Sequence, residues 1–215
     1  GMKVSIIFLD YSARQGFEYQ SKKNLENCGI DVSVFRVDML GIAKAINFGL
    51  KITQNFDYVA IMANDIEMPV NWLKSMIEWA ERLKSYKVGI VGIHTVESLP
   101  GIDKNGVHPT WCPFGNWLLT REVINSVGAF NEDHDPYGMQ DSDYGYRANK
   151  LGFYNFYIPE LKASHIGHDC GEQTDYRKMK DDGLSRAGVI YMQGIERYNE
   201  TKNYYLPLIK ENGQK

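Results

Sequence analysis

A short acidic triplet carries residue types that metal chemistry requires. Asp65 and Glu67 stand one residue apart, directly after the apolar run 58–62. Two carboxylates at the end of a buried strand can hold a hard divalent cation through oxygen, and the cation can in turn bind a diphosphate. Acidic residues in a solvated loop show the same spacing. The triplet alone therefore leaves both interpretations open.

A second acidic pair stands at the predicted start of a helix. Asp141 and Asp143 flank Ser142 there. A carboxylate such as that of Asp141 can act as a general base and take a proton from a hydroxyl. Acidic side chains at a helix N-terminus also stabilise the helix through its dipole. We favour this structural role for Asp143 and leave both roles open for Asp141.

Two histidines follow a predicted strand and a proline, in the stretch S-H-I-G-H. They are His165 and His168. Imidazole is a suitable ligand for a borderline metal such as manganese when carboxylates complete the site. Loop histidines with local hydrogen bonds would explain the same spacing, so the pair indicates a metal site only in combination with other ligands.

An aromatic cluster surrounds Pro113 and Gly115. It consists of Trp111, Phe114 and Trp117. Aromatic faces in a loop are suited to stacking on sugar rings, and packing in a core or a lid is the alternative.

The first 93 residues alternate between apolar runs and helical patterns. We predict strands at 4–9, 32–37, 58–62 and 88–93, and helices at 17–28, 42–50 and 71–84. Continuous runs rich in β-branched residues are typical of strands buried on both faces of a parallel sheet. The alternation predicts an α/β fold with a mostly parallel central sheet flanked by helices. The acidic triplet then lies beyond the carboxyl end of a strand, where open parallel sheets bind ligands.

The second half is less regular, and we see no linker that divides the chain. Residues 94–116 are rich in Pro and Gly and are predicted to form a loop. Further predicted elements are a strand at 117–119, a helix from 120 to about 128, a helix at 141–151, a strand at 153–158 that stops at Pro159, and a helix over 175–205. We therefore predict one domain over residues 2–215.

Composition excludes several classes of protein. Lys and Arg number 24, Asp and Glu number 27, and the net charge is −3, which argues against a basic surface that binds nucleic acid. Cys28, Cys112 and Cys170 form no C-x-x-C motif, which argues against a disulfide scaffold or a structural zinc site. No apolar stretch approaches the roughly 20 residues of a transmembrane helix, and no signal peptide opens the chain. We expect a cytoplasmic protein, with peripheral contact at the inner face of the membrane left open.

The order of these motifs resembles the family 2 glycosyltransferases, in their bacterial form. The matching stretches are N-D-I-E-M-P-V-N-W-L-K-S-M at 64–76, F-G-N-W-L-L-T-R-E-V-I-N-S-V-G-A-F-N-E at 114–132, Y-G-M-Q-D-S-D-Y-G-Y-R-A-N-K-L-G at 137–152 and S-H-I-G-H at 164–168. The resemblance spans roughly residues 3–170. It implies the GT-A fold and transfer of a sugar from a nucleotide-diphosphate donor to a hydroxyl acceptor, with inversion and with Mn2+ or Mg2+ as cofactor. It also implies a saccharide or lipid-linked acceptor and a place in cell-surface or capsular polysaccharide synthesis.

The resemblance implies roles for individual residues. Asp65 matches the metal-ligating Asp of the family, with Glu67 as a secondary candidate, and His165 matches its late histidine, often a third metal ligand. Asp141 matches the base that acts on the acceptor hydroxyl. The candidates for donor binding are Asp10, Asp38, Gly41, Asn47 and Asn64, and those for acceptor binding are Trp111, Phe114, Asn116, Trp117 and Gln140.

The chain departs from the family pattern in three places. Ala63 stands where the first Asp of a D-x-D motif falls, and Gln140 replaces the Glu that precedes the base. The acidic, Ser-containing turn that holds the nucleobase and ribose is missing after the second predicted strand. We expect an abbreviated nucleotide-binding half (2–93), an acceptor and metal half (94–170) and a C-terminal helical lid or tail (171–215).

Three other functions remain open at this point. A sugar nucleotidyltransferase would share the sheet and the acidic metal site, but it requires a Gly-rich phosphate loop, and residues 10–16 offer one Gly and one Arg. A degenerate GT-A-fold module that only binds a partner is the second alternative. A metallohydrolase built on His165 and His168 is the third.

Overall fold

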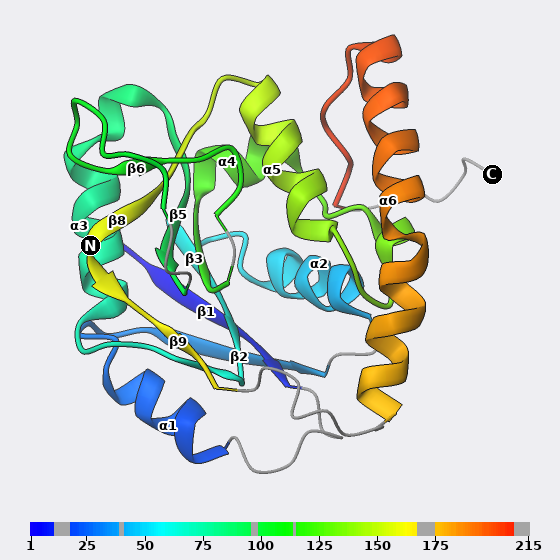
Figure 1. Ribbon diagram of the computed structural model, residues 1–215. Helices are drawn as coiled ribbons and strands as arrows, with labels where there is room; N and C mark the ends of the chain where they lie inside the picture. Colours follow the sequence, from blue (N-terminus) through cyan, green and yellow to red (C-terminus); the bar gives the residue numbers. More distant parts are fainter. Residues whose placement is uncertain (11–17, 39–40, 96–98, 114, 167–174, 209–215) are drawn as a thin grey trace.

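The protein is described here from a computed structural model (Figure 1), which covers residues 1–10, 18–38, 41–95, 99–113, 115–166 and 175–208. The strands are β1 (Val4–Asp10), β2 (Ser33–Asp38), β3 (Tyr58–Ala63), β4 (Ile66–Glu67), β5 (Val88–His94), β6 (His108–Pro109), β7 (Trp117–Thr120), β8 (Tyr154–Lys162) and β9 (Ser164–His165). The helices are α1 (Glu18–Glu26), α2 (Ile42–Ile52), α3 (Trp72–Arg82), α4 (Arg121–Val127), α5 (Gln140–Lys150) and α6 (Asp175–Thr201), with 3-10 turns η1 (Lys84–Tyr86) and η2 (Glu132–His134).

The described strands form a large sheet in the order β2-β1-β3-β7-β5-β8-β6 and a small one that pairs β4 with β9. In the large sheet β1 is parallel to both β2 and β3, and β5 is parallel to β8. Strand β7 is antiparallel to both of its neighbours, and β6 is antiparallel to β8. The predicted mostly parallel α/β sheet is therefore confirmed.

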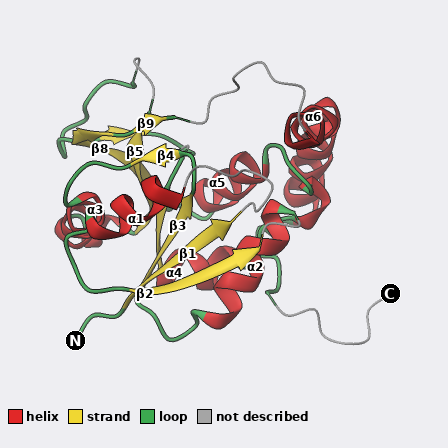
Figure 2. Ribbon diagram, turned by 90° about the horizontal axis from the view of Figure 1, so that it is seen from below, coloured by secondary structure: helices red, strands yellow, loops and turns green. Residues whose placement is uncertain are grey.

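The central strands bury both of their faces, as their continuous apolar runs predict. In β1, Ile6 and Phe8 pack into one core cluster and Ile7 and Leu9 pack into the other. Side chains alternate across a strand, so neighbouring residues serve opposite layers. Helices α1 and α3 cover the first face, and α2, α4 and α5 cover the second, as Figure 2 shows from below.

Strand β7 brings a segment of the second half to the ligand edge of the sheet. It lies between β3 and β5, and Trp117 at its start pairs with Ile61 near the carboxyl end of β3. The antiparallel direction of β7 is the reason that its amino end lies at this edge. The Asn116 side chain accepts a hydrogen bond of 2.9 Å from the Ala63 amide and fixes the end of β3.

Two predicted boundaries in the second half are wrong. Strand β8 does not stop at Pro159 but continues to Lys162. Its pairing with β5 shifts register between the pairs Gly92–Tyr157 and His94–Lys162, so proline occupies an irregular stretch of the ladder where its missing N–H costs little.

Helix α6 ends at Thr201 rather than at residue 205. The chain beyond it turns back to the end of α4, where the Leu206 amide donates to the Val127 carbonyl at 3.0 Å and the Leu206 carbonyl accepts from the Ala129 amide at 2.7 Å. None of the described helices is both long and apolar enough to cross a membrane.

Candidate active site

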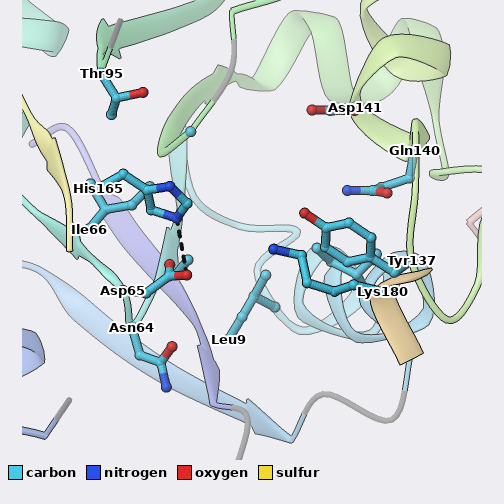
Figure 3. A pocket seen from close by; sticks show the side chains of 13 residues that line it. Leu9, Asn64, Asp65, Ile66, Thr95, Tyr137, Gln140, Asp141, His165 and Lys180 are labelled. Carbon is cyan, nitrogen blue, oxygen red and sulfur yellow. Dashed lines mark hydrogen bonds and ion pairs between the residues drawn. The ribbon is translucent and has the colours of Figure 1, made fainter. Parts of the chain in front are cut away.

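A cavity of about 300 Å³ opens at the carboxyl ends of β1 and β3 (Figure 3). This is the edge at which open α/β sheets bind ligands. The polar part of its lining includes Asn64, Asp65, Gln140, Asp141, His165 and Lys180. These side chains come from the end of β3, the start of α5, strand β9 and helix α6. The cavity therefore collects residues from both halves of the chain.

Two very short strands bring together two of the predicted metal ligands. Ile66 of β4 pairs with His165 of β9, and the Ile166 amide donates to the Asp65 carbonyl at 2.9 Å. The Nε2 atom of His165 lies 3.1 Å from Oδ2 of Asp65. The Asp65 side chain is largely buried and that of His165 is partly exposed. Asp65 and His165 thus form a carboxylate–imidazole pair at the cavity wall.

This pair has the chemistry that a divalent cation such as Mn2+ accepts, because it offers one carboxylate oxygen and one imidazole nitrogen at close range. Within the described ranges, no group of three or more His, Cys, Asp or Glu residues is arranged to hold a metal ion. A cation held here would therefore complete its coordination with oxygens from a ligand or from water, as Mg2+ and Mn2+ sites that bind phosphates do. His168, the other predicted candidate, lies outside the described residues.

Glu67 is not brought to this pair. Its Oε1 accepts from Nζ of Lys23 on α1 at 2.9 Å, and both side chains are 42% exposed. Glu67 is absent from the described lining of the cavity. The structure therefore separates the two carboxylates of the triplet, and only Asp65 faces the cavity.

Asp141 lies across the cavity from the Asp65–His165 pair, as Figure 3 shows. It belongs to the first turn of α5, and its Oδ1 accepts from the Ser142 amide at 2.8 Å. Burial raises the pKa of Asp141 above its usual value, although the amide hydrogen bond and His134 act in the opposite direction. A raised pKa makes this carboxylate a stronger base than a free one, provided that it is ionised.

Asp143 points into the interior instead. Its Oδ1 accepts from Nε of Arg147 at 2.8 Å, its Oδ2 accepts from the Tyr198 hydroxyl at 2.9 Å, and Nε2 of His134 lies 3.8 Å away. Burial alone would raise the pKa of Asp143, but Arg147, His134 and Tyr198 together hold it below its usual value. Asp143 therefore forms a buried ion pair with Arg147 inside α5, and the hydrogen bond that it accepts from Tyr198 joins α5 to α6.

Gly41 and Asn47, which match the donor side of the family, pack against or hydrogen-bond to other parts of the protein. A Cβ atom on Gly41 would lie 2.8 Å from the carboxyl carbon of Asp135. The Asn47 amide group donates to the Phe130 carbonyl at 2.9 Å and to Glu132 at 3.1 Å, and its oxygen accepts from the Phe130 amide at 2.7 Å. Neither residue is among those that line the cavity in the described structure.

The two other acids proposed for the donor lie at the ends of neighbouring strands. Asp10 of β1 and Asp38 of β2 are paired in register. Asp10 forms an ion pair with Arg36, and Asp38 is exposed. The residues that follow each strand lie outside the described ranges. Of the predicted donor residues, only Asn64 therefore lines the cavity in the described structure.

The residues proposed for the acceptor separate into core and surface. Trp117 is buried and stacks on Phe130 with ring centroids 5.6 Å apart, and both rings border a smaller cavity of about 80 Å³ that also reaches Gln140 and Asp141. Trp111 is 42% exposed and lies 6.5 Å from the Tyr191 ring of α6. Gln140 lines the cavity, and its Oε1 accepts from the Gly138 amide at 3.0 Å. Asn116 holds the end of β3, as described above, and Phe114 lies outside the described residues.

Lys180 and Tyr137 are cavity residues that the sequence analysis missed. Lys180 comes from α6, is only 7% exposed, and places its ammonium group 5.0 Å from the centre of the Tyr137 ring. Nothing in the sequence distinguishes this lysine from the other charged residues of α6, because its place in the cavity depends on how α6 docks.

Comparisons with known proteins identify the fold. No protein-family model matches the chain, and no curated protein sequence matches it. Many solved structures do. The mannosyltransferase PcManGT from Pyrobaculum calidifontis, in complex with GDP-Man and Mn2+, has a TM-score of 0.62 and 15% identity over 91% of this chain and 64% of that one. The catalytic domain of Drosophila β1,4-galactosyltransferase 7, in complex with xylobiose, has a TM-score of 0.57 and 15% identity over 83% and 79%. A fragment of S. aureus TarS in complex with UDP-GlcNAc has a TM-score of 0.52 and 12% identity over 78% and 61%.

At these identities the likeness establishes the fold. The chain has the mixed α/β architecture of the GT-A glycosyltransferases, and the GT-A fold predicted from its motifs is confirmed.

Proposed function

We propose that this protein is a glycosyltransferase that moves a sugar from a nucleotide-diphosphate donor to a hydroxyl acceptor. The observation that carries the proposal is the placement of Asp65, His165 and Asp141 around one cavity of a GT-A fold. A metal-binding pair on one wall and a carboxylate base on the opposite wall are the groups that this reaction requires.

The similar structures support this class of substrates. PcManGT was solved with GDP-Man and Mn2+, TarS with UDP-GlcNAc, and the Drosophila enzyme with xylobiose. By analogy, we propose a nucleotide-sugar donor and a saccharide or lipid-linked acceptor for this chain.

Asp65 and His165 would hold Mn2+ or Mg2+, which when bound neutralises the negative charge of the donor diphosphate. Both side chains are held by the short β4–β9 sheet, so their donor atoms are positioned before a ligand arrives. Asn64, which is buried at the same strand end, would contact the donor next to them.

Asp141 would act as the base. It takes the proton of the acceptor hydroxyl while the acceptor oxygen forms a bond to the anomeric carbon of the sugar. The bond between that carbon and the diphosphate oxygen breaks, and its electron pair leaves with the nucleoside diphosphate. Because Asp141 faces the Asp65–His165 pair across the cavity, acceptor and leaving group would lie on opposite sides of the sugar. This arrangement supports inversion, the outcome expected of family 2 enzymes.

In this proposal residues 2–93 form the nucleotide-binding half and residues 94–170 the acceptor and metal half. Trp111 and Gln140 would contact the acceptor. Synthesis of cell-surface polysaccharide, with peripheral contact at the membrane, is the setting that the family resemblance suggests.

The proposal is tested by calorimetric titration of UDP and GDP with Mn2+ and with a chelator. We expect one of the two to bind in Mn2+ and binding to fall sharply in chelator and in Asp65→Asn. Glu67→Gln is the matched control, because Glu67 lies two residues away and pairs with Lys23 outside the cavity. Binding that is indifferent to the metal and to Asp65 would contradict the metal role.

Two alternative functions can be tested with the same purified protein. A sugar nucleotidyltransferase would release pyrophosphate from a nucleoside triphosphate and a sugar phosphate, and we expect none. A degenerate binding module would bind a partner without affinity for any nucleotide sugar. Residues 11–17, where most of a phosphate-binding motif would stand, lie outside the described residues.

A further inference from the structure

We infer that Lys180 of α6 binds the diphosphate of the donor and neutralises the leaving group together with the metal. This inference rests on the proposed function and extends the donor site to the C-terminal helix. Lys180 is only 7% exposed, and it lines the same cavity as Asp65 and His165. Figure 3 shows its ammonium group directed into the cavity from the wall opposite that pair.

A buried lysine at this position requires an anionic environment. Removing an ammonium group from water is costly unless negative charge or hydrogen-bond acceptors compensate for it. The Tyr137 ring beside the side chain supplies a cation–π contact at 5.0 Å. The ammonium group borders the cavity in which the diphosphate is expected.

The N-terminus of helix α2 lies at the same cavity, but its first amides are not free to bind the diphosphate. Helix N-termini commonly bind phosphate through free backbone amides, and α2 begins at this cavity with Ile42 in its lining. Its amides are already engaged. The Ile42 amide donates to the Pro136 carbonyl at 3.2 Å, and those of Ala43 and Lys44 donate to the Asp135 carboxylate at 2.8 and 3.1 Å. These three amides of α2 are therefore not available to a phosphate group.

With the donor bound, the cavity would hold more negative charge than one divalent cation can neutralise. Asp65 and Asp141 bring two carboxylates, and each phosphate group of the donor adds a negative charge. A divalent cation offsets only part of this total. Among the described lining residues, Lys180 is the only Lys or Arg. It is positioned to attract the charge that develops on the leaving group.

Helix α6 is docked closely enough to hold Lys180 in place. A Cβ atom on Gly183 would lie 2.1 Å from the Tyr137 carbonyl oxygen, so a glycine allows the helix to touch the loop before α5. Arg186, one turn further, donates to the Asp135 carbonyl. The Tyr198 hydroxyl donates to Asp143 at 2.9 Å. These contacts fix α6 against the rest of the protein, and they therefore hold the ammonium group of Lys180 at the cavity.

The test is calorimetric titration of Lys180→Met and Lys180→Arg with the nucleoside diphosphate that binds the native protein, UDP or GDP, and with the corresponding monophosphate. Lys178→Met is the matched control, because Lys178 lies on the same helix and is exposed. We expect Lys180→Met to weaken diphosphate binding about tenfold to hundredfold and monophosphate binding less. Lys180→Arg should retain part of the affinity, and Lys178→Met should retain all of it.

The outcomes separate this inference from the proposed function. Native affinity in a folded Lys180→Met, with affinity lost in Asp65→Asn, would overturn the role of Lys180 and leave the glycosyltransferase proposal standing. If the native protein binds no nucleoside diphosphate, both fail. A thermal melt checks that each variant is folded. Should Lys180→Met not fold, Lys180→Gln takes its place, and native affinity for the nucleoside diphosphate in that folded variant would also overturn the inference.

Discussion

Asp141 and Asp143 stand two residues apart on the same helical turn and have opposite environments. Asp141 faces the cavity, and burial raises its pKa. Asp143 faces the interior, and despite its burial Arg147, His134 and Tyr198 lower its pKa. Positions two apart on an α-helix point to nearly opposite sides. The cations and hydrogen-bond donors around an acidic residue therefore decide its role, and its spacing in the sequence does not.

The two environments are also connected. Asp143 holds Tyr198 of α6, and the same helix carries Lys180 into the cavity. The hydrogen bond from Tyr198 to Asp143 therefore stabilises the contact between α5 and α6 on which one wall of the cavity depends.

The largest expected effect is on catalysis at Asp141. We expect Asp141→Asn to lower the transfer rate about 10²- to 10⁴-fold, the usual contribution of a positioned general base. Donor affinity and unfolding free energy should change little, because the amide has nearly the same shape. Steady-state kinetics and urea denaturation measure the two quantities. A variant that transfers sugar at the native rate would remove Asp141 as the base.

Asp143→Asn should show the reverse pattern. Arg147 would remain buried without its counter-charge, and breaking such a pair typically costs about 3–5 kcal/mol of stability. Urea denaturation at neutral pH gives this value. Loss of transfer without loss of unfolding free energy would mean that the interior and cavity roles have been assigned to the wrong residues.

Acid should separate the two aspartates without a mutation. The pKa of Asp141 is raised above its usual value, so its base function is present above that raised pKa and is lost as pH falls through it. The pKa of Asp143 is lowered below 3.8, so its stabilising contribution is complete above 3.8 and is lost only as pH falls through the lower pKa. We expect the transfer rate to decline at a higher pH than the stability that Asp143 supplies. Asp141→Asn should flatten the acidic limb of the rate profile while leaving acid unfolding in place.

The smallest effect is expected at Glu67. Its ion pair with Lys23 is well exposed, and such pairs contribute about 0–1 kcal/mol. Glu67→Gln should therefore leave both stability and transfer nearly unchanged. A loss of metal-dependent donor binding comparable to that of Asp65→Asn would show that the triplet acts as a unit.

The sequence predicted the layered α/β fold because long apolar runs have a clear period. It predicted less of the site. Asp65 and His165 are 100 positions apart and meet through β4 and β9, two-residue strands too short to have a period. Only the resemblance to a known family linked them.

Other site residues were beyond sequence reasoning for physical reasons. Trp117 resembled a ligand-binding aromatic residue, and the sequence did not show that its strand buries it beside Phe130, at the edge of a small cavity. Asn47 resembled a donor contact, but its amide is saturated by the segment after α4. Lys180 could not be predicted because its position depends on the docking of α6 against Tyr137.

The proposed function is tested most directly by the rate at which a nucleoside diphosphate is released from nucleotide sugars. This rate is measured for the native protein and for Asp141→Asn, with a panel of nucleotide sugars, Mn2+ and saccharide acceptors. We predict release by the native protein from at least one donor, in a manner that depends on acceptor and metal, and a rate at least about 100-fold lower for the variant. Equal rates for the two proteins would contradict the assignment of the cavity as a glycosyl-transfer site with Asp141 as its base.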